Sequence, residues 1–365
     1  EAQGRELEMA GEKYRVGIIG LGRMGSTIDD EGHTQLPYSI AAATKASPHL
    51  ELVTGADVIE DKRSAFSERW GVEAVYEDFR EMVTLEKPDL VAVCTAACLP
   101  KPANASPGPD HRDDAHADLT MALTELGVFM LYVEKAMASS MERADGVLEA
   151  VTRSGAQFNT GVLRRFDNRY AVVRDAVVAG AIGQVQAVVH YASSSLMHGH
   201  IHSIDTISFL IDDPPIEAVR GELLPRDVGF SGRHIDHDPR ATYQLHFAGN
   251  IEAYTVPAGH WEFEVLGSEG CIRLLNNGAA VVLRKGSGKA GWQEEPFQFV
   301  TPKSPVISCL EDLVQSKMTG RPTLGNVNLT HHITEACIGV AESHLQGGAW
   351  IELPLPARDL YIFHV

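Results

Sequence analysis

The feature that most constrains this chain is a glycine-rich turn that directly follows a short apolar run. The run Tyr14–Ile19 leads into Gly20-Leu21-Gly22-Arg23-Met24-Gly25, and a helix-like stretch follows. A G-x-G-x-x-G between a buried strand and a helix is typical of a site for the pyrophosphate of a dinucleotide. The first glycine permits the tight turn, the second lets the backbone approach the pyrophosphate, and the third allows close helix–strand packing. The alternative is a glycine-rich turn that binds no ligand.

The pattern of apolar runs predicts a different architecture in each half of the chain. In the first half, apolar runs ending near residues 57, 95 and 133 alternate with helix-like stretches. This alternation predicts a doubly wound parallel sheet, which binds ligands at the carboxyl ends of its strands. After residue 150 the strand-like runs become consecutive, with short turns such as Ala248-Gly249-Asn250 between them. Consecutive strands joined by short turns predict a largely antiparallel sheet.

The predicted fold class is therefore α/β, with an N-terminal Rossmann domain and a C-terminal α+β domain built on a large, mainly antiparallel sheet. We expect a polar extension over residues 1–12, an NAD-binding domain over 13–138, and a substrate-binding and oligomerisation domain over 139–365. A proline-rich stretch within 99–113 follows the third predicted strand. It is either a tolerated surface insertion or a lid over the substrate.

Composition narrows the class of partner. The chain has 365 residues, of which 44% are hydrophobic, and a formal net charge of −18. The length suggests two domains, and the hydrophobic fraction excludes a chain that is disordered throughout. A surface this acidic repels phosphate backbones, and no apolar run approaches the roughly 20 residues of a membrane span. We therefore expect neither a nucleic-acid nor a membrane partner. Five scattered cysteines fit no disulfide framework, which predicts a reducing, cytoplasmic location.

Asp57 ends the second predicted strand, where dinucleotide-binding domains hold the adenosine ribose. A carboxylate there accepts the ribose hydroxyls of NAD and repels the 2′-phosphate of NADP. The interval after Gly25 exceeds the usual value of about 20 residues, and the insertion Asp29–His33 accounts for part of the excess. Lys62 and Arg63 lie too far along the chain to overturn this preference. We expect NAD, with NADP less favoured; the alternative for Asp57 is a turn or helix-capping residue.

Six segments, spread over nearly the whole chain from residue 14, resemble the ordered motifs of one enzyme family. Val133–Ala138 resembles an E-K-P motif, although Ala136 replaces the proline. His202-Ser203-Ile204-Asp205 resembles an H-x-x-D motif, and His198 stands where many members have an aspartate. The other matching segments are Val16–Gly25, Val93–Thr95, Gly161–Asp167 and Phe263–Gly270. In this order they resemble the Gfo/Idh/MocA oxidoreductases, that is, glucose–fructose oxidoreductase, inositol dehydrogenase and their relatives.

A nicotinamide enzyme that oxidises an alcohol needs a base for the hydroxyl proton and positive charge near the forming alkoxide. Lys135 follows a predicted strand at its carboxyl end, so it is placed to supply that charge, and the resemblance implies the same role. The alternative is a lysine that pairs with Glu134 or caps the following helix. The resemblance also implies cofactor contacts, and the expected set is Gly20, Leu21, Gly22, Arg23, Met24, Gly25, Asp57, Cys94, Thr95, His116, Glu134, Lys135 and Arg164.

His198, His202 and Asp205 are spaced by four and three residues within a run whose apolar residues recur at helical spacing. On a helix these three side chains share one face. His202, with an ordinary pKa near 6.5, is the predicted general base. Asp205 orients it, stabilises its charge or binds the sugar, and His198 is a second substrate contact or a proton relay. Alternate histidines on a strand would suit zinc, but a helix turns His200 away, so we expect no metal site.

Arg164 and Arg165 are expected to bracket the cofactor amide and a hydroxyl or carboxylate of the substrate. Their alternative is an ion pair with Asp167 or Asp175. The predicted function is an NAD-dependent dehydrogenase that transfers a hydride between a secondary alcohol of a sugar, cyclitol or glycoside and the nicotinamide. One alternative is an NAD-using glycosidase or lyase with a transient keto-sugar and no net redox change, and another is a non-catalytic cofactor or sugar sensor. The resemblance implies a homodimer or homotetramer formed through the second sheet.

Overall fold

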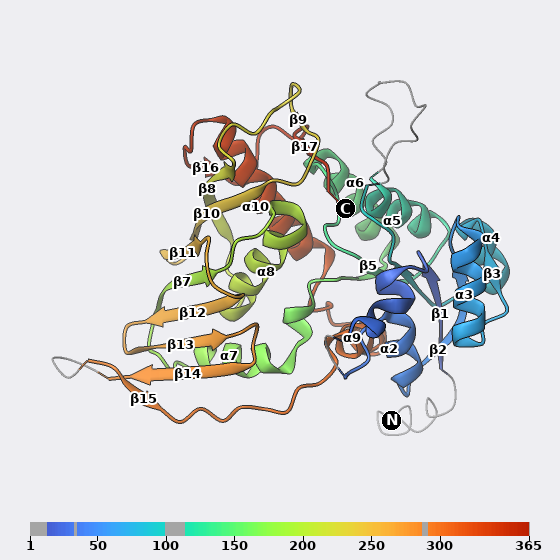
Figure 1. Ribbon diagram of the computed structural model, residues 1–365, viewed down its shortest axis with the longest axis horizontal. Coiled ribbons are helices and arrows are strands. Elements are labelled where there is room, and N and C mark those ends of the chain that lie inside the picture. The colour runs from blue at the N-terminus through green and yellow to red at the C-terminus, as the bar shows by residue number, and fades with distance from the viewer. Residues whose placement is uncertain (1–12, 33–34, 99–113, 287–290, 365) are drawn as a thin grey trace.

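The computed structural model describes residues 13–32, 35–98, 114–286 and 291–364, and two sheets organise this part of the chain (Figure 1). The first sheet contains β1 (Tyr14–Ile19), β2 (Leu50–Ala56), β3 (Val75–Tyr76), β4 (Leu90–Val93), β5 (Met130–Val133) and β6 (Gln157–Thr160). Its order is β3-β2-β1-β4-β5-β6, and every pair is parallel. The predicted doubly wound sheet is thus confirmed. Its order reverses between β1 and β4, where such sheets bind ligands.

The first half alternates buried strands with capped helices. Every residue of β4 and β5 is buried, as expected of parallel strands covered on both faces. Ser39, Asp78, Asp114 and Ser140 each accept a hydrogen bond from a backbone N–H in the first turn of a helix. The helices are α2 (Ile40–Ala46), α3 (Glu60–Trp70), α4 (Phe79–Glu86), α5 (Ala115–Glu125) and α6 (Met141–Ser154).

The second sheet is mainly antiparallel, as predicted, with one exception at its centre. There β7 (Val185–Tyr191) pairs parallel with β11 (Ile251–Val256) and antiparallel with β12 (Glu262–Gly267). The remaining strands are β8 (Ile216–Leu224), β10 (Arg240–Phe247), β13 (Gly270–Leu275), β14 (Ala280–Lys285), β15 (Gln293–Glu295) and β16 (Ile351–Glu352). The order is β15-β14-β13-β12-β7-β11-β10-β8-β16.

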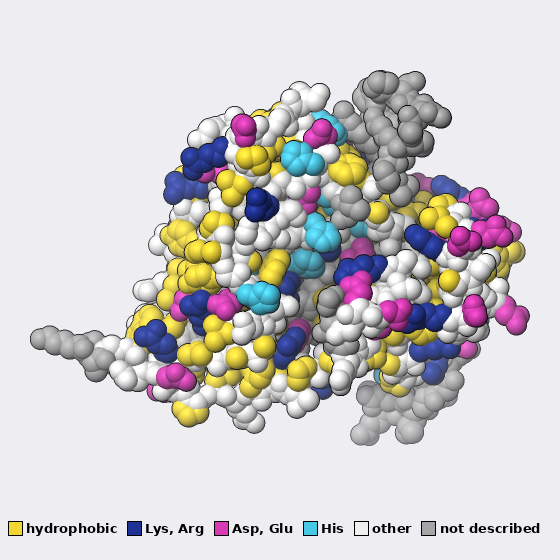
Figure 2. Space-filling view, in the orientation of Figure 1, with side chains coloured by type: hydrophobic (Ala, Val, Ile, Leu, Met, Phe, Trp, Pro, Cys, Tyr) yellow, Lys and Arg dark blue, Asp and Glu magenta, His cyan; other side chains and the backbone are white. Residues whose placement is uncertain are grey.

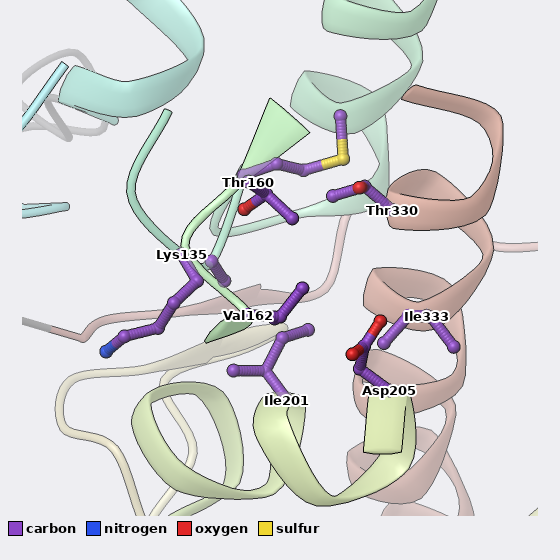
Figure 3. A pocket seen from close by; sticks show the side chains of 9 residues that line it. Lys135, Thr160, Val162, Ile201, Asp205, Thr330 and Ile333 are labelled. Carbon is purple, nitrogen blue, oxygen red and sulfur yellow. The ribbon is translucent and has the colours of Figure 1, made fainter. Parts of the chain in front are cut away.

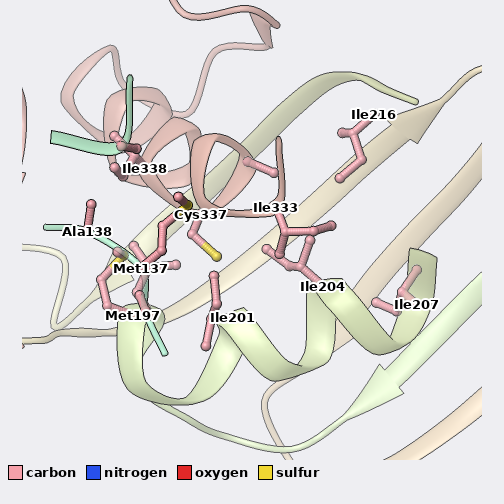
Figure 4. Packing of buried hydrophobic residues seen from close by; sticks show 14 of the residues in the cluster. Met137, Ala138, Met197, Ile201, Ile204, Ile207, Ile216, Ile333, Cys337 and Ile338 are labelled. Atoms are coloured by element: carbon pink, nitrogen blue, oxygen red, sulfur yellow. The ribbon is translucent and has the colours of Figure 1, made fainter. Parts of the chain in front are cut away.

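One apolar face fixes the helix that carries the predicted base. Helix α8 (Ile201–Leu210) packs Ile201, Ile204 and Ile207, all buried, toward α10 (Val327–Leu345), which contributes Ile333 and Cys337 (Figure 4). Helix α10 lies in turn on β8. Because this packing sets the rotation of α8, it also sets the direction of His202. Helix α7 (Asn168–Val178) packs beside α8.

Helix α9 (Pro305–Thr319) returns to the first sheet although it belongs to the second half of the sequence (Figure 1). Leu310 and Leu313 share a buried cluster with Ile18 of β1. Asn159 of β6 donates from Nδ2 to the Cys309 carbonyl oxygen at 3.0 Å. The expected boundary at residue 138 is therefore crossed by a helix that completes the core of the first half.

A small third sheet ties a late segment to the loops at the ends of β4 and β5. In it β17 (Tyr361–Ile362) pairs parallel with β9 (His234–Ile235). The Ile362 N–H donates to the Ser139 carbonyl at 2.9 Å, and the Cys98 N–H donates to the His364 carbonyl at 3.2 Å. The expected extension at 1–12 and the insertion at 99–113 lie outside the described residues. Among the residues that are described, no helix combines the length and apolarity needed to cross a membrane.

Candidate active site

Packing requires two glycines of the loop that follows β1. Gly20 has a φ of 89°, and a Cβ there would lie 2.7 Å from backbone atoms of Cys94 and Thr95. A Cβ on Gly25 would overlap the carbonyl oxygen of Gly20. The loop can press against the end of β4 only because both positions lack a side chain.

Gly22, the second glycine of the motif, meets no such demand. Among the described residues, only the Lys62 Nζ atom lies within 4 Å of a Cβ built there, at 3.6 Å. That position is where the backbone of this motif approaches a pyrophosphate. Packing thus accounts for Gly20 and Gly25, whereas room for a ligand accounts for Gly22. The loop therefore fits a dinucleotide, whose phosphates its backbone N–H groups would hold.

The stretch after the glycine loop differs from the regular helix that the motif predicts. It consists of a π-helical turn, η1 (Arg23–Thr27), and a 3-10 turn, η2 (Ile28–Glu31). The Asp29 carboxylate accepts the backbone N–H groups of Tyr38 at 2.7 Å and Ser39 at 3.0 Å. The acidic insertion therefore ends the first turn early and directs the chain into α2.

Three side chains within the loop have contacts inside the protein. Leu21 is buried, and Met24 packs against the same apolar cluster. The Arg23 guanidinium pairs with the Glu31 carboxylate, with Nη2 at 2.7 Å from Oε2. Contacts from Leu21, Arg23 and Met24 to a dinucleotide would therefore come from backbone N–H groups.

Asp57 lies directly after β2 and faces the glycine loop. Its Oδ2 atom accepts the Leu21 N–H at 2.9 Å, and its Oδ1 atom accepts the Ile59 N–H at 3.0 Å. The Lys62 Nζ atom lies 3.9 Å from Oδ2, and the Arg63 guanidinium donates to the Asp57 carbonyl at 2.7 Å. Asp57 therefore anchors the loop and remains the predicted ribose acceptor, but it has cationic neighbours that the sequence spacing did not place there.

His116 occupies a different place from the one expected. It is 1% exposed, and its Nδ1 and Nε2 atoms lie 2.8 Å and 3.0 Å from the carbonyl oxygens of Ala136 and Thr95. The ring joins the loop after β4 to the loop after β5, which carries Lys135. This corrects the expected cofactor contact: both ring nitrogens are used by backbone, so His116 acts as a positioning residue.

Glu134 and Cys94 line the base of the same region. Tyr132 donates from its hydroxyl to the Glu134 carboxylate at 2.5 Å, and a Cβ on Gly161 would lie 2.7 Å from that carboxylate. Both Glu134 and Cys94 are buried, and burial raises the pKa of the Cys94 thiol. The thiol therefore stays protonated. Contacts of Cys94, Thr95 and Glu134 with the cofactor stay predictions.

Lys135 follows β5, and its side chain meets the histidine segment of the second half. Its Nζ atom lies 3.0 Å from His198 Nδ1 and 3.4 Å from the His198 carbonyl oxygen. Burial is the main cause that lowers the Lys135 pKa from its ordinary value. The peptide bond between Lys135 and Ala136 is cis although the second residue is not proline. The structure thus brings together two predicted residues that lie 63 positions apart.

Asp238 is a residue of this site that the sequence did not reveal. Its two carboxylate oxygens accept the backbone N–H groups of Met197 at 2.8 Å and His198 at 2.7 Å. These bonds fix the turn η4 (Leu196–His200), which places His198 against Lys135. In the sequence, the only indication of a role for Asp238 is its position between β8 and β10 of the second sheet.

His202 lies within electrostatic range of Lys135, Arg164 and His198. Its Nδ1 atom is buried and has no hydrogen-bond partner among the described residues, whereas the residue as a whole is partly exposed. Burial first, and then the charges of Lys135, Arg164 and His198, lower its pKa well below the ordinary value. His202 is therefore neutral near pH 7, the form that a general base needs.

The middle histidine of the segment serves the fold. His200 is buried, and its ring nitrogens lie 3.0 Å from Ser203 Oγ and from the Ala241 carbonyl oxygen. Within the described part of the chain, no group of three or more histidine, cysteine, aspartate or glutamate side chains is arranged to hold a metal ion.

Arg165 and Asp205 form a buried ion pair. Arg165 Nη2 lies 2.8 Å from Asp205 Oδ1, and Arg165 Nη1 lies 2.7 Å from Asp213 Oδ2. The Arg165 side chain is 1% exposed. This corrects the expected substrate contact, because the guanidinium is enclosed and bonded to two carboxylates. Its role is to hold Asp205 and the start of the loop after α8.

Asp205 still reaches a small cavity beneath Lys135 (Figure 3). The cavity, about 10 Å³, is lined by Asp205, Thr160, Val162 and the stem of Lys135, whose amino group points away from it. Asp205 Oδ2 and Thr160 Oγ1 are buried without a partner among the described residues. Burial raises the Asp205 pKa to about 6. No hydrogen bond joins Asp205 to His202 in the described structure, so its expected role in orienting the base stays a prediction.

Arg164 lies at the edge of the site, on the side of the second sheet. Its Nε atom donates to Asn277 Oδ1 at 2.9 Å, and its guanidinium lies 4.4 Å from the centre of the Trp261 ring. It is partly exposed, so it keeps groups for a cofactor amide or a substrate. Figure 2 shows histidine and basic side chains gathered along the seam between the two halves of the molecule.

The fold and site define a dinucleotide-binding oxidoreductase. Residues 14–162 match the family model of the Gfo/Idh/MocA oxidoreductases, described as an oxidoreductase family with an NAD-binding Rossmann fold. The chain is 26% identical over 298 residues to scyllo-inositol 2-dehydrogenase (NAD(+)) of Bacillus subtilis, covering 75% of this chain and 78% of that enzyme. The match to the Gfo/Idh/MocA family covers the Rossmann half of the chain, and the chain is an NAD-binding oxidoreductase, as predicted.

Solved structures share the complete fold. An aldose-aldose oxidoreductase from Caulobacter crescentus, complexed with glycerol, matches with a TM-score of 0.73 at 18% identity, over 94% of this chain and 100% of that chain. The WlbA dehydrogenase from Bordetella pertussis, in complex with NADH and UDP-GlcNAcA, matches with a TM-score of 0.70 at 14% identity, over the same shares of the two chains. At these identities the matches establish the architecture alone.

Proposed function

We propose that this oxidoreductase transfers a hydride between NAD and a secondary alcohol of a sugar or cyclitol. The observation that carries the proposal is the meeting of Lys135 Nζ with His198 Nδ1 at 3.0 Å beside the neutral base His202, at the carboxyl end of β5. The similarity to a scyllo-inositol 2-dehydrogenase supports a cyclitol or a related polyol as the class of substrate.

The protonation state of each residue decides its proposed role in the reaction. Bound NAD supplies the hydride acceptor. His202 accepts the hydroxyl proton at Nε2, because its Nδ1 atom is buried. Lys135 places a positive charge beside the developing alkoxide, where electrostatic stabilisation has its largest effect. His198 shares the Lys135 ammonium and offers a second polar contact to the ring.

Asp205 and Arg164 support this arrangement from either side. We propose that Asp205, held by Arg165, supplies negative charge near His202 as that residue takes up a proton. Arg164, partly exposed and held by Asn277, is the proposed contact to the cofactor amide or to a substrate hydroxyl. Arg165 is left out of the substrate contacts because its side chain is enclosed.

We also propose that the second sheet carries the contact of a homodimer or homotetramer. Tyr254 and Val256 alternate along β11 on one face of that sheet, and their exposed fractions are 39% and 37%. Large apolar side chains on an open sheet face favour association. Light scattering on protein eluting from a size-exclusion column should give the mass of two or four chains. A monomer would contradict this proposal.

The substrate is found by incubating the protein with NAD and a panel of inositols, aldoses, polyols and glycosides. We expect NADH to form with at least one member of the panel. Release of a substituent without net NADH would instead support a lyase or glycosidase reaction through a transient keto-sugar. Saturable polyol binding with no chemistry would support a sensor.

A further inference from the structure

We propose that Lys62 sets the cofactor choice of this enzyme, by allowing the 2′-phosphate of NADP to bind beside Asp57 as well as the plain ribose of NAD. The inference rests on dinucleotide binding at the glycine loop and not on the identity of the alcohol. It depends on the position of the Lys62 ammonium between the glycine loop, which would hold the pyrophosphate, and Asp57, which would hold the adenosine ribose.

Lys62 projects from the first turn of α3 over the loop after β1. Its Nζ atom lies 3.9 Å from Asp57 Oδ2 and 3.6 Å from a Cβ built on Gly22. The pyrophosphate approaches a Rossmann domain at the second glycine, and the ribose hydroxyls approach the carboxylate at the end of the second strand. The ammonium therefore lies over the gap between those two sites, where a substituent on the ribose 2′-oxygen would project.

The two charged groups differ in how far they reach into solvent. The Asp57 side chain is 7% exposed, and its oxygens already accept the backbone N–H groups of Leu21 and Ile59. The Lys62 side chain is 45% exposed on a flexible stem. An arriving 2′-phosphate thus meets the cation before the carboxylate. The repulsion that normally makes Asp57 exclude NADP is offset at close range.

Arg63 is a second cation that contacts Asp57. Arg63 donates to the Asp57 carbonyl oxygen, and no carboxylate of the described chain forms an ion pair with it. Glu60 and Asp61 of the same turn are exposed, and neither pairs with Lys62 in the described structure. Lys62 and Arg63 therefore both contact Asp57 at the ribose edge, while Glu60 and Asp61 face solvent.

The carboxylates of the nearby acidic insertion have partners other than Lys62. Asp30 pairs with Arg69 at 2.7 Å, and Glu31 pairs with Arg23 at 2.7 Å. Asp30 and Glu31 are thus each paired with an arginine, Asp29 accepts backbone N–H groups, and the exposed Lys62 ammonium can reach a phosphate.

The test measures the affinity of the full chain for NADH and for NADPH by the fluorescence of the reduced nicotinamide. Wild-type protein should bind NADPH within about tenfold of NADH. Lys62→Met should weaken NADPH binding about tenfold, the scale of one charge-assisted hydrogen bond, and change NADH binding less than about threefold. Added salt should weaken NADPH binding more than NADH binding, because exposed charges are screened.

Lys45→Met is the matched control, because Lys45 is an exposed lysine of the same half at the end of α2. It should change neither affinity. Failure of wild-type protein to bind NADPH under conditions that saturate NADH would overturn the inference. So would an equal loss of both affinities in Lys62→Met, or a selective loss that appears in Arg63→Met but not in Lys62→Met. Failure of the wild type to bind NADH would instead overturn dinucleotide binding itself.

Discussion

At the scale of single residues, the glycine loop separates what packing demands from what a ligand demands. Gly20 and Gly25 are required by backbone contacts within the protein, whereas Gly22 borders open space next to Lys62. A motif in the sequence contains all three without distinguishing them. The distinction gives each glycine its own expected phenotype.

Gly22→Ala should leave the free energy of unfolding within about 0.5 kcal/mol, since its methyl group meets only the movable end of Lys62. NADH affinity should fall at least about tenfold, because the methyl group occupies the place of the pyrophosphate. Gly25→Ala should cost about 1–3 kcal/mol of stability, because it overlaps the backbone of the loop. Urea unfolding and NADH fluorescence check both variants. Equal stability losses in the two would contradict this division.

His202 should give the enzyme an unusually acidic lower limit of activity. Burial and the cations around it disfavour the imidazolium, so the base remains neutral below the ordinary histidine pKa of 6.5. The acid limb of the kcat/KM profile for alcohol oxidation should therefore fall at a pH below 6.5. The profile is measured with a saturating NAD concentration. An acid limb at or above the ordinary value would contradict the placement of His202 as the base.

Residue types in the sequence were enough to select Lys135, His198 and His202, which the structure brings to one place. Residue types were not enough to predict the roles of Arg165 and His116, because the partners of these two residues are distant in sequence. Arg165 is enclosed because Asp205 and Asp213 lie on either side of it. His116 is buried because two loop carbonyls converge on its ring. Such burial depends on tertiary contacts that no local spacing encodes.

At the scale of elements, strongly patterned segments were predictable and weakly patterned ones were not. The apolar runs that end near residues 57, 95 and 133 correspond to β2, β4 and β5, and the strands expected on either side of Ala248-Gly249-Asn250 are β10 and β11. The two-residue β3 and the polar β6 were missed, because neither carries an apolar period of its own. The parallel pairing of β7 with β11, and the return of α9 to the first sheet, are choices of topology that no local pattern records.

The buried pair between η3 (Leu163–Phe166) and α8 should dominate local stability. Arg165→Met should lower the free energy of unfolding by about 3–5 kcal/mol, because it removes the only cation that pairs with the buried Asp205 in the described structure and leaves that carboxyl group without its hydrogen-bond donors. Arg153→Met removes an exposed pair with Glu149 and should cost less than about 1 kcal/mol. Urea unfolding followed by circular dichroism compares them. Similar losses in both variants would contradict a structural role for Arg165.

At the scale of the whole molecule, the two halves make the candidate site together. The first sheet contributes the glycine loop, Asp57 and Lys135, and the second half contributes His198, His202 and Arg164 around them. On the face drawn in Figure 2, histidine and basic side chains lie along the seam between the halves, with some acidic side chains among them. In the proposed reaction, cofactor and alcohol meet where the two halves meet, beside Lys135.

The most direct measurement is turnover of NAD with the best polyol from the panel, by wild-type protein and by Lys135→Ala. The variant should form NADH at least about 100-fold more slowly, the scale of losing one stabilising group at the oxyanion. It should bind NADH within about threefold of wild type, and Lys45→Ala should match the wild type in both respects. Wild-type turnover in Lys135→Ala, or the absence of NADH formation with every polyol, would contradict the proposed reaction.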